Sequence, residues 1–213
     1  MKKLKILGIS FSLICILQTS GMAQKSIEGE FYFQRMEMVA GFNFTADGKF
    51  QFFYSYGAVD RNASGSYSIE GDLIKLKSDK EPGKDFTITQ QSKKGHGYTL
   101  VFEDPNKYFL SNIRCLFYTD GKPEEVLSNS DGEVHVEFAH CDSIYIQHGL
   151  YPDIFTLIKD EKNQNNFFRI SLNRTLEQVS FKGIDLKIQD DSTLTCLANY
   201  LMPMENISFL QKK

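Results

Sequence analysis

Apolar residues alternate with polar ones along almost the whole chain, and this period of two most constrains the fold. In the clearest case a turn at Ala46-Asp47-Gly48 separates two runs with aromatic even positions: Phe42, Phe44, Phe50, Phe52, Tyr54 and Tyr56. Successive side chains of a strand point to opposite faces, so this pattern predicts strands with one buried face. We therefore predict an all-β protein in which residues 42–56 form a hairpin with an aromatic inner face.

Turn residues divide the predicted strands into two sets. Before the polar cluster Glu103-Asp104-Pro105-Asn106 the pattern predicts an antiparallel meander of about seven short strands. A residue before proline is pushed toward an extended conformation, so this cluster is the best candidate boundary. We predict a β-meander domain over residues 24–104 and a β-sandwich domain over residues 105–213. The segment 176–213 either completes the sandwich or folds back onto the first unit.

The first 23 residues have the pattern of a secretory signal peptide. Lys2, Lys3 and Lys5 precede an apolar run over residues 6–17, and small residues at positions 21 and 23 suit cleavage before Gln24. The run is shorter than the ~20 apolar residues that a membrane-spanning helix needs. Cys15 lies in the run without the small preceding residue typical of a lipidated cysteine. We expect an exported protein, periplasmic or at the cell surface, without a transmembrane anchor.

Charge and cysteine content restrict the partners further. Loss of the signal peptide with its three lysines changes the net charge from −3 to −6, which disfavours nucleic acid as a partner. Three cysteines remain, Cys115, Cys141 and Cys196, and their spacing matches no zinc signature. An odd number allows one disulfide and a free thiol, or three cysteines that act as small buried hydrophobes.

Two stretches resemble known families. The sequences GFNFTADGKF at residues 41–50 and GSYSIEGDLIKL at residues 65–76 resemble the F-x-x-D-G-x-F and G-x-Y-x-I-x-G-D-x-I-x-L style of secreted lipocalin-like barrels of bacterial envelopes. Residues 119–136, with Ile144-Tyr145-Ile146 and residues 168–172, are similar to transthyretin-like or carboxypeptidase regulatory-like sandwiches. These resemblances imply a barrel followed by a sandwich in a secreted, binding or scaffolding protein, and they imply no reaction.

The sharpest candidate site lies at the end of the aromatic hairpin. Tyr54 and Tyr56 are followed by a loop at Gly57 and by the adjacent charges of Asp60 and Arg61. In a barrel this arrangement predicts a rim site for a small polar or amphipathic ligand. The alternative is structural: the tyrosines complete the core, while Asp60 and Arg61 cap the loop through backbone hydrogen bonds.

The histidines give a weaker prediction. His135 and Glu137 share one face of a predicted strand, where they either present an imidazole and a carboxylate to a metal or a substrate or form a solvated face. His140, Cys141 and Asp142 are adjacent, but neighbouring side chains on an extended backbone point apart. We predict no metal site and no cofactor.

Signatures of catalysis are missing from the sequence. It contains no G-x-S-x-G motif, no glycine-rich phosphate loop and no dinucleotide fingerprint. Trp is also absent, so stacking on a sugar would fall to Tyr or Phe, and the sequence gives little support to a sugar-binding role. We predict a non-enzymatic binding protein of the bacterial cell envelope that holds a small amphipathic ligand in or near the aromatic-lined first unit. The alternatives are a structural or partner-binding envelope protein and, third, a hydrolase built on His135 and Glu137.

Overall fold

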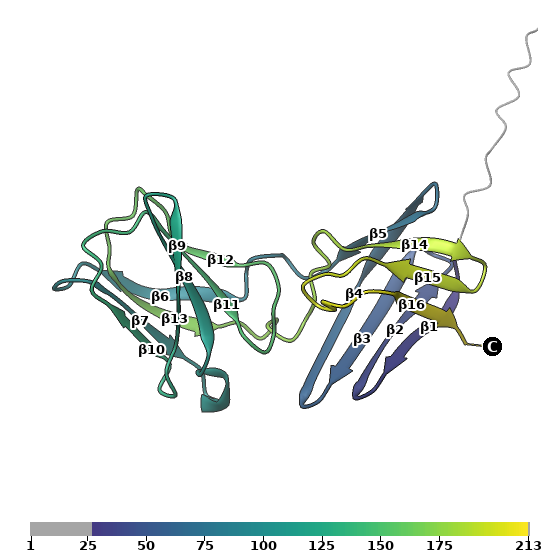
Figure 1. The fold of residues 1–213 in the computed structure, drawn as a ribbon, viewed down its shortest axis with the longest axis horizontal. Coiled ribbons are helices and arrows are strands. Elements are labelled where there is room, and N and C mark those ends of the chain that lie inside the picture. The colour runs from purple at the N-terminus through teal and green to yellow at the C-terminus, as the bar shows by residue number, and fades with distance from the viewer. Residues whose placement is uncertain (1–26, 213) are drawn as a thin grey trace, which may run out of the picture.

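The structure, a computed structural model, describes residues 27–212 and confirms the predicted all-β class (Figure 1). The predicted signal peptide lies outside the described residues. The elements are β1 Gly29–Arg35, β2 Met38–Thr45, β3 Lys49–Tyr56, β4 Val59–Glu70, β5 Leu73–Ser78, β6 Phe86–Ser92, β7 Tyr98–Glu103, a 3-10 helix Lys107–Phe109, β8 Ile113–Thr119, β9 Lys122–Leu127, β10 Glu133–Val136, β11 Ser143–His148, β12 Thr156–Lys159, β13 Phe167–Leu172, β14 Asp185–Asp190, β15 Thr193–Cys196 and β16 Ile207–Gln211. Within these residues no helix is long and apolar enough to cross a membrane.

Eight strands form a closed antiparallel barrel, on the right in Figure 1. Their order around the barrel is β1-β16-β15-β14-β5-β4-β3-β2. The predicted aromatic hairpin is β2 and β3, in which Phe42 pairs with Phe52 and Phe44 pairs with Phe50. The strand alternation therefore predicted this hairpin and its buried face correctly, because both depend on local sequence.

Aromatic rings fill the barrel interior beside β2 and β3. The ring of Phe42 lies with its centroid 4.7 Å from Phe52, 5.1 Å from Phe209 and 5.5 Å from Phe181. Phe181 comes from the segment before β14 and keeps a φ of 54°, a left-handed conformation that bulky residues rarely adopt. These contacts make the aromatic interior a packed core.

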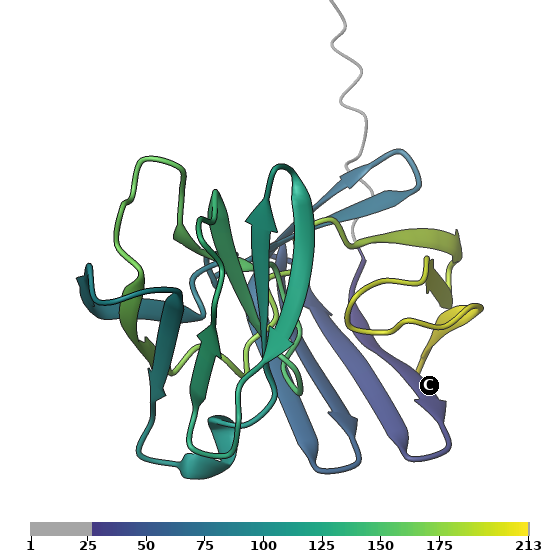
Figure 2. The ribbon, with the colours of Figure 1, turned by 60° about the vertical axis from the view of Figure 1, so that its left-hand side comes forward.

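The chain between β5 and β14 forms a β-sandwich, on the left in Figure 1 and in front of the barrel in Figure 2. One sheet has the order β10-β7-β13-β6 and the other the order β12-β11-β8-β9. Phe102 and Phe168 from the first sheet and Phe117, Ile144 and Ile146 from the second belong to one buried cluster. The two sheets therefore share one core, as expected for a sandwich.

The strand pairing differs from the predicted boundary at residue 104. Strands β6 and β7 belong to the sandwich, and β14, β15 and β16 return to close the barrel between β1 and β5. The sandwich is thus inserted into the barrel, and the chain crosses between them at residues 79–85 and 173–184. Polar residues 103–106 only connect β7 to the 3-10 helix and β8. A turn signal marks where a strand ends, but it does not say which sheet the next strand joins.

The three cysteines are free thiols in the described chain. Cys115 and Cys141 are buried in the sandwich core and Cys196 is half-buried in the barrel. Burial raises the pKa of the Cys115 thiol and raises that of Cys196 to about 12, so both stay protonated at neutral pH. Cys115 and Cys141 act here as small buried hydrophobes, which is the second of the two alternatives stated from the sequence.

Candidate functional site

The barrel sheet separates the four residues of the predicted rim site. Tyr54 and Arg61 are paired across β3 and β4 and are buried, whereas Asp60 and Tyr56 are exposed. Because neighbouring residues of a strand point to opposite faces, Asp60 and Arg61 cannot line the same surface. Register thus places Tyr54, Tyr56 and Arg61 on one face of the sheet and Asp60 on the other.

Arg61 reaches the junction between barrel and sandwich. Its side chain is almost completely buried and donates hydrogen bonds to the carbonyl oxygens of Pro152 and, at 2.9 Å, Gln178. Its Nη2 atom lies 3.9 Å from Asp153 Oδ2, and its guanidinium carbon lies 6.0 Å from the centroid of the Tyr151 ring. The Nε atom of Arg61 has no hydrogen-bond partner among the described residues.

Three further buried charges complete a junction cluster of Arg61, Lys80, Asp85 and Asp153. Lys80 Nζ lies 2.8 Å from Asp153 Oδ2, 2.7 Å from Asp85 Oδ1 and 2.7 Å from the carbonyl oxygen of Gln178. Asp153 also accepts hydrogen bonds from the backbone and hydroxyl of Ser180. With all four groups ionised, two cations balance two anions.

Burial and pairing shift the two carboxyl groups of the junction cluster in opposite directions. Burial raises the pKa of Asp85 to about 6, although the charge of Lys80 opposes the rise. Burial also acts to raise the pKa of Asp153, but hydrogen bonds from Lys80 and Ser180 outweigh it and hold this pKa below its usual value. Asp153 is therefore the firmly ionised anion of the cluster, and Asp85 is the group that titrates near pH 6.

The location of the junction cluster gives it a structural role. Lys80 and Asp85 lie on the crossing from β5 to β6, and Gln178 and Ser180 lie on the crossing from β13 to β14. Asp153 comes from the sandwich loop between β11 and β12. The cluster thus ties a barrel strand to a sandwich loop and to both crossings of the chain. Its charges face one another in a closed interior and are not accessible to a ligand.

The predicted histidine sites stay on the solvated surface. His135 Nε2 lies 2.7 Å from Glu137 Oε1, and both side chains are more than half exposed. His140 Nε2 lies 3.8 Å from Asp120 Oδ1, also on the surface. Over residues 27–212 no three His, Cys, Asp or Glu side chains gather closely enough to hold a metal ion.

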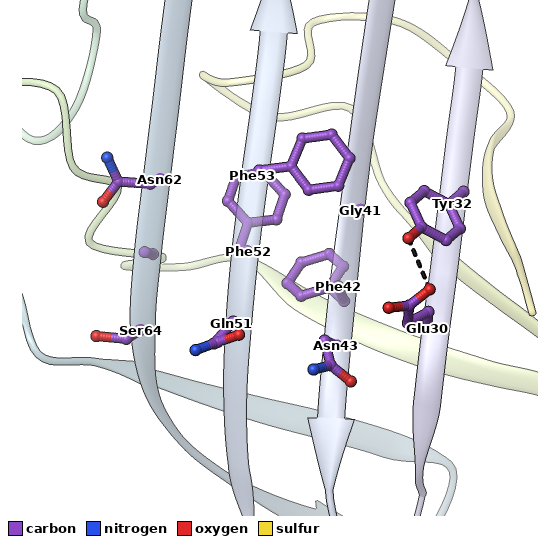
Figure 3. Close-up of a pocket in the computed structure, with 11 residues that line it drawn as sticks. Glu30, Tyr32, Gly41, Phe42, Asn43, Gln51, Phe52, Phe53, Asn62 and Ser64 are labelled. Carbon is purple, nitrogen blue, oxygen red and sulfur yellow. Dashed lines mark hydrogen bonds between the residues drawn. The ribbon is translucent and has the colours of Figure 1, made fainter.

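A hollow of about 430 Å³ lies on the outer face of β1–β4 (Figure 3). We call it the outer hollow. Strand register builds it from two neighbouring rows of side chains. An aromatic row crosses the sheet as Tyr32, Gly41, Phe53 and Asn62, and the next row crosses as Glu30, Asn43, Gln51 and Ser64. An apolar surface and a line of hydrogen-bonding groups therefore lie side by side on one sheet face.

Gly41 allows the two rings of the aromatic row to meet. A Cβ atom at this position would lie 2.5 Å from Phe53 Cε1, closer than real Cβ contacts, and 3.0 Å from Tyr32 Cδ1, a tight contact. The rings of Tyr32 and Phe53 lie with centroids 6.0 Å apart, and in Figure 3 the Phe53 ring leans across the strand toward Gly41. Phe53 remains 40% exposed. The glycine thus lets an accessible aromatic platform form over β2.

Two members of the polar row, Asn43 and Gln51, carry side-chain amides that are free to bind a ligand, whereas the Ser64 hydroxyl donates a hydrogen bond of 2.7 Å to Asp79. Tyr32 donates a hydrogen bond of 2.8 Å to Glu30, whose carboxylate also lies 3.5 Å from Lys212 Nζ. This hydrogen bond from Tyr32, together with the charge of Lys212, lowers the pKa of Glu30. Within the described chain no hydrogen bond engages the side-chain amides of Asn43, Gln51 or Asn62, which face solvent.

The aromatic even positions of residues 42–56 point inward and so did not indicate the outer hollow, which the odd positions of the same two strands help to line. Phe53 was the available signal: it directly follows Phe52, so it places an aromatic ring on the otherwise polar face of its strand. Of the predicted rim residues only Asp60 lies near, since its pair Ser55 is two positions from Phe53 on the same face.

Comparison of the chain with models of known protein families, with curated proteins and with solved structures found no match. The closed barrel of eight antiparallel strands is compatible with the predicted lipocalin-like barrel at the level of architecture.

Proposed function

We propose that this chain is an exported, non-enzymatic binding protein of the bacterial cell envelope, and that it holds a small amphipathic ligand in the outer hollow. The observation that carries the proposal is the pair of rows set by strand register, with Tyr32, Gly41 and Phe53 beside Asn43 and Gln51. Binding sites for small molecules are largely apolar with a few placed polar groups, and these rows supply both.

In this proposal the barrel is a lipocalin-like scaffold, but its ligand lies on the outer face and not inside the barrel. Lipocalin-like barrels with eight strands are wide enough to hold one small ligand inside. Here Phe42, Phe52, Phe181 and Phe209 meet in the interior, so we assign the ligand to the outer face of the same strands.

The chemistry of the outer hollow favours binding over catalysis. Its polar groups are amides, a serine hydroxyl and the carboxylate of Glu30, whose pKa is lowered. A general acid or base works best with a pKa near the working pH. Asp85, whose pKa burial raises to about 6, is enclosed in the junction cluster. These groups suit recognition of a ligand by hydrogen bonds.

Octyl β-D-glucoside below its micelle concentration is a suitable amphipathic probe, because it carries both an alkyl chain and a polar ring. We expect the wild-type protein to bind it and Phe53→Ala to weaken the affinity by about tenfold, since the platform loses its ring. Isothermal titration calorimetry measures both affinities.

The matched control for this test is Tyr56→Ala. Tyr56 lies on the same strand, is 49% exposed and belongs to the predicted rim site, but it does not line the outer hollow. We expect this variant to bind like the wild type. An equal loss in both variants, or no binding by the wild type, contradicts the proposal.

A further inference from the structure

We infer that the outer hollow recognises a neutral pyranose sugar, with the C–H face of the ring on Phe53 and its hydroxyl groups on the row of Asn43 and Gln51. This inference rests on the proposed function and specifies its ligand class. It combines the shape, the hydrogen-bonding groups and the charge of the site.

The aromatic row fits the flat apolar side of a sugar ring. An aromatic face carries partial negative charge, so it attracts C–H groups that carry partial positive charge. Phe53 offers such a face, because its ring leans over Gly41 and stays 40% exposed. Tyr32 borders the platform, and its hydrogen bond to Glu30 fixes the orientation of its ring. A pure alkyl chain would use this platform but would leave the neighbouring polar row unused.

The polar row fits hydroxyl groups. A hydroxyl both donates and accepts a hydrogen bond, and the side-chain amides of Asn43 and Gln51 likewise offer donors and an acceptor. Adjacent rows on one sheet face are separated by two residues, about 7 Å along the strand. A ring that stacks on Phe53 therefore projects the hydroxyls on its rim toward Asn43 and Gln51. Asn62, next to Phe53 in register, can bind a hydroxyl at another edge.

The charge of the site favours a neutral ligand. Among the described residues that line the outer hollow, Glu30 carries the one formal charge at neutral pH, and no Lys or Arg is present. Lys212 does not line the outer hollow, and its charge is already paired: its Nζ lies 3.5 Å from Glu30 Oε2 and 5.5 Å from the centroid of the Tyr32 ring. Phosphate and carboxylate ligands bind most strongly to cationic groups, which Glu30 and the amides do not supply.

Strands β1–β4 together span about 14 Å across the sheet, which is long enough for a short stretch of glycan.

The test separates the sugar ring from the alkyl chain of the probe. Cellotriose carries neutral pyranose rings without a chain, whereas tetraethylene glycol monooctyl ether carries the same chain without a sugar. We expect cellotriose to bind, Phe53→Ala to weaken its affinity by about tenfold and Gln51→Ala to weaken it severalfold, with Tyr56→Ala unchanged. Saturation-transfer NMR on cellotriose should show transfer to the C–H protons of its rings with the wild type, and clearly weaker transfer with Phe53→Ala. Circular dichroism confirms that each variant is folded.

The outcomes distinguish this inference from the proposed function. If the octyl ether binds in a Phe53-dependent way and cellotriose does not, the proposed function stands and the sugar inference is overturned. If neither ligand nor octyl glucoside binds, both are overturned. If cellotriose binds equally to the wild type and Phe53→Ala, the sugar does not stack on Phe53 and the inferred site is wrong.

Discussion

Replacing Asp153 by alanine is expected to lower the free energy of unfolding by about 4 kcal/mol at pH 7. Asp153 is the anion that both Lys80 and Arg61 approach, and it accepts two hydrogen bonds from Ser180. Its removal leaves two buried cations with only Asp85 to balance them. Removing one partner of a buried ion pair is costly because the remaining charge loses its compensation inside the protein.

An exposed ion pair of the same residue types provides the control. Lys75 Nζ lies 2.5 Å from Asp185 Oδ2, with each side chain about two-fifths exposed. Surface pairs are screened by solvent, so Asp185→Ala should cost less than about 1 kcal/mol. Urea titrations followed by circular dichroism and by tyrosine fluorescence measure both changes, and agreement of the two signals checks that unfolding remains a single transition. A cost for Asp153→Ala as small as that for Asp185→Ala would show that the junction cluster contributes no stability.

The barrel was predictable where it depends on neighbouring residues. The alternation of residues 42–56 predicted both strands of the hairpin, because side-chain direction follows from the strand period alone. The closure of the barrel was not predictable in this way. Phe31 pairs with Gln211 across almost the entire chain, and alternation specifies which face of a strand is buried but not which strand lies beside it.

The candidate sites were not predictable from local sequence either, because strand pairing and loop burial decide which of their residues meet. Asp60 and Arg61 are adjacent in sequence, yet the sheet sends one to solvent and the other to the junction. The rows of the outer hollow join residues 30 and 64 through two intermediate strands, so they appear only when the register is known. Lys80, Asp85 and Asp153 lie in connecting segments, where charged residues are normally exposed, and nothing local in the sequence indicates their burial.

The second carboxyl group of the junction cluster should respond in the opposite way to Asp153. We expect Asp85→Asn to raise the free energy of unfolding by about 3 kcal/mol at pH 8. The pKa of Asp85 is raised from 3.8 to about 6 in the folded protein, so the folded state binds the proton more tightly than the unfolded chain does. Ionising this carboxyl therefore costs stability, and the cost accumulates as the pH rises from about 4 through 6. Asparagine avoids that cost because it stays neutral.

The pH dependence separates this effect from a simple change in packing. The stability difference between Asp85→Asn and the wild type should be small at pH 4, where Asp85 is largely protonated, and should grow to its full value above pH 7. Lys80 keeps Asp153 and the carbonyl of Gln178 as partners in the variant. Glu81→Gln removes an exposed carboxylate from the same crossing and should change stability little at either pH. Urea titrations at pH 4, 6 and 8 measure the difference, and a variant less stable than the wild type at pH 8 would mean that attraction to Lys80 outweighs the burial cost of the Asp85 charge.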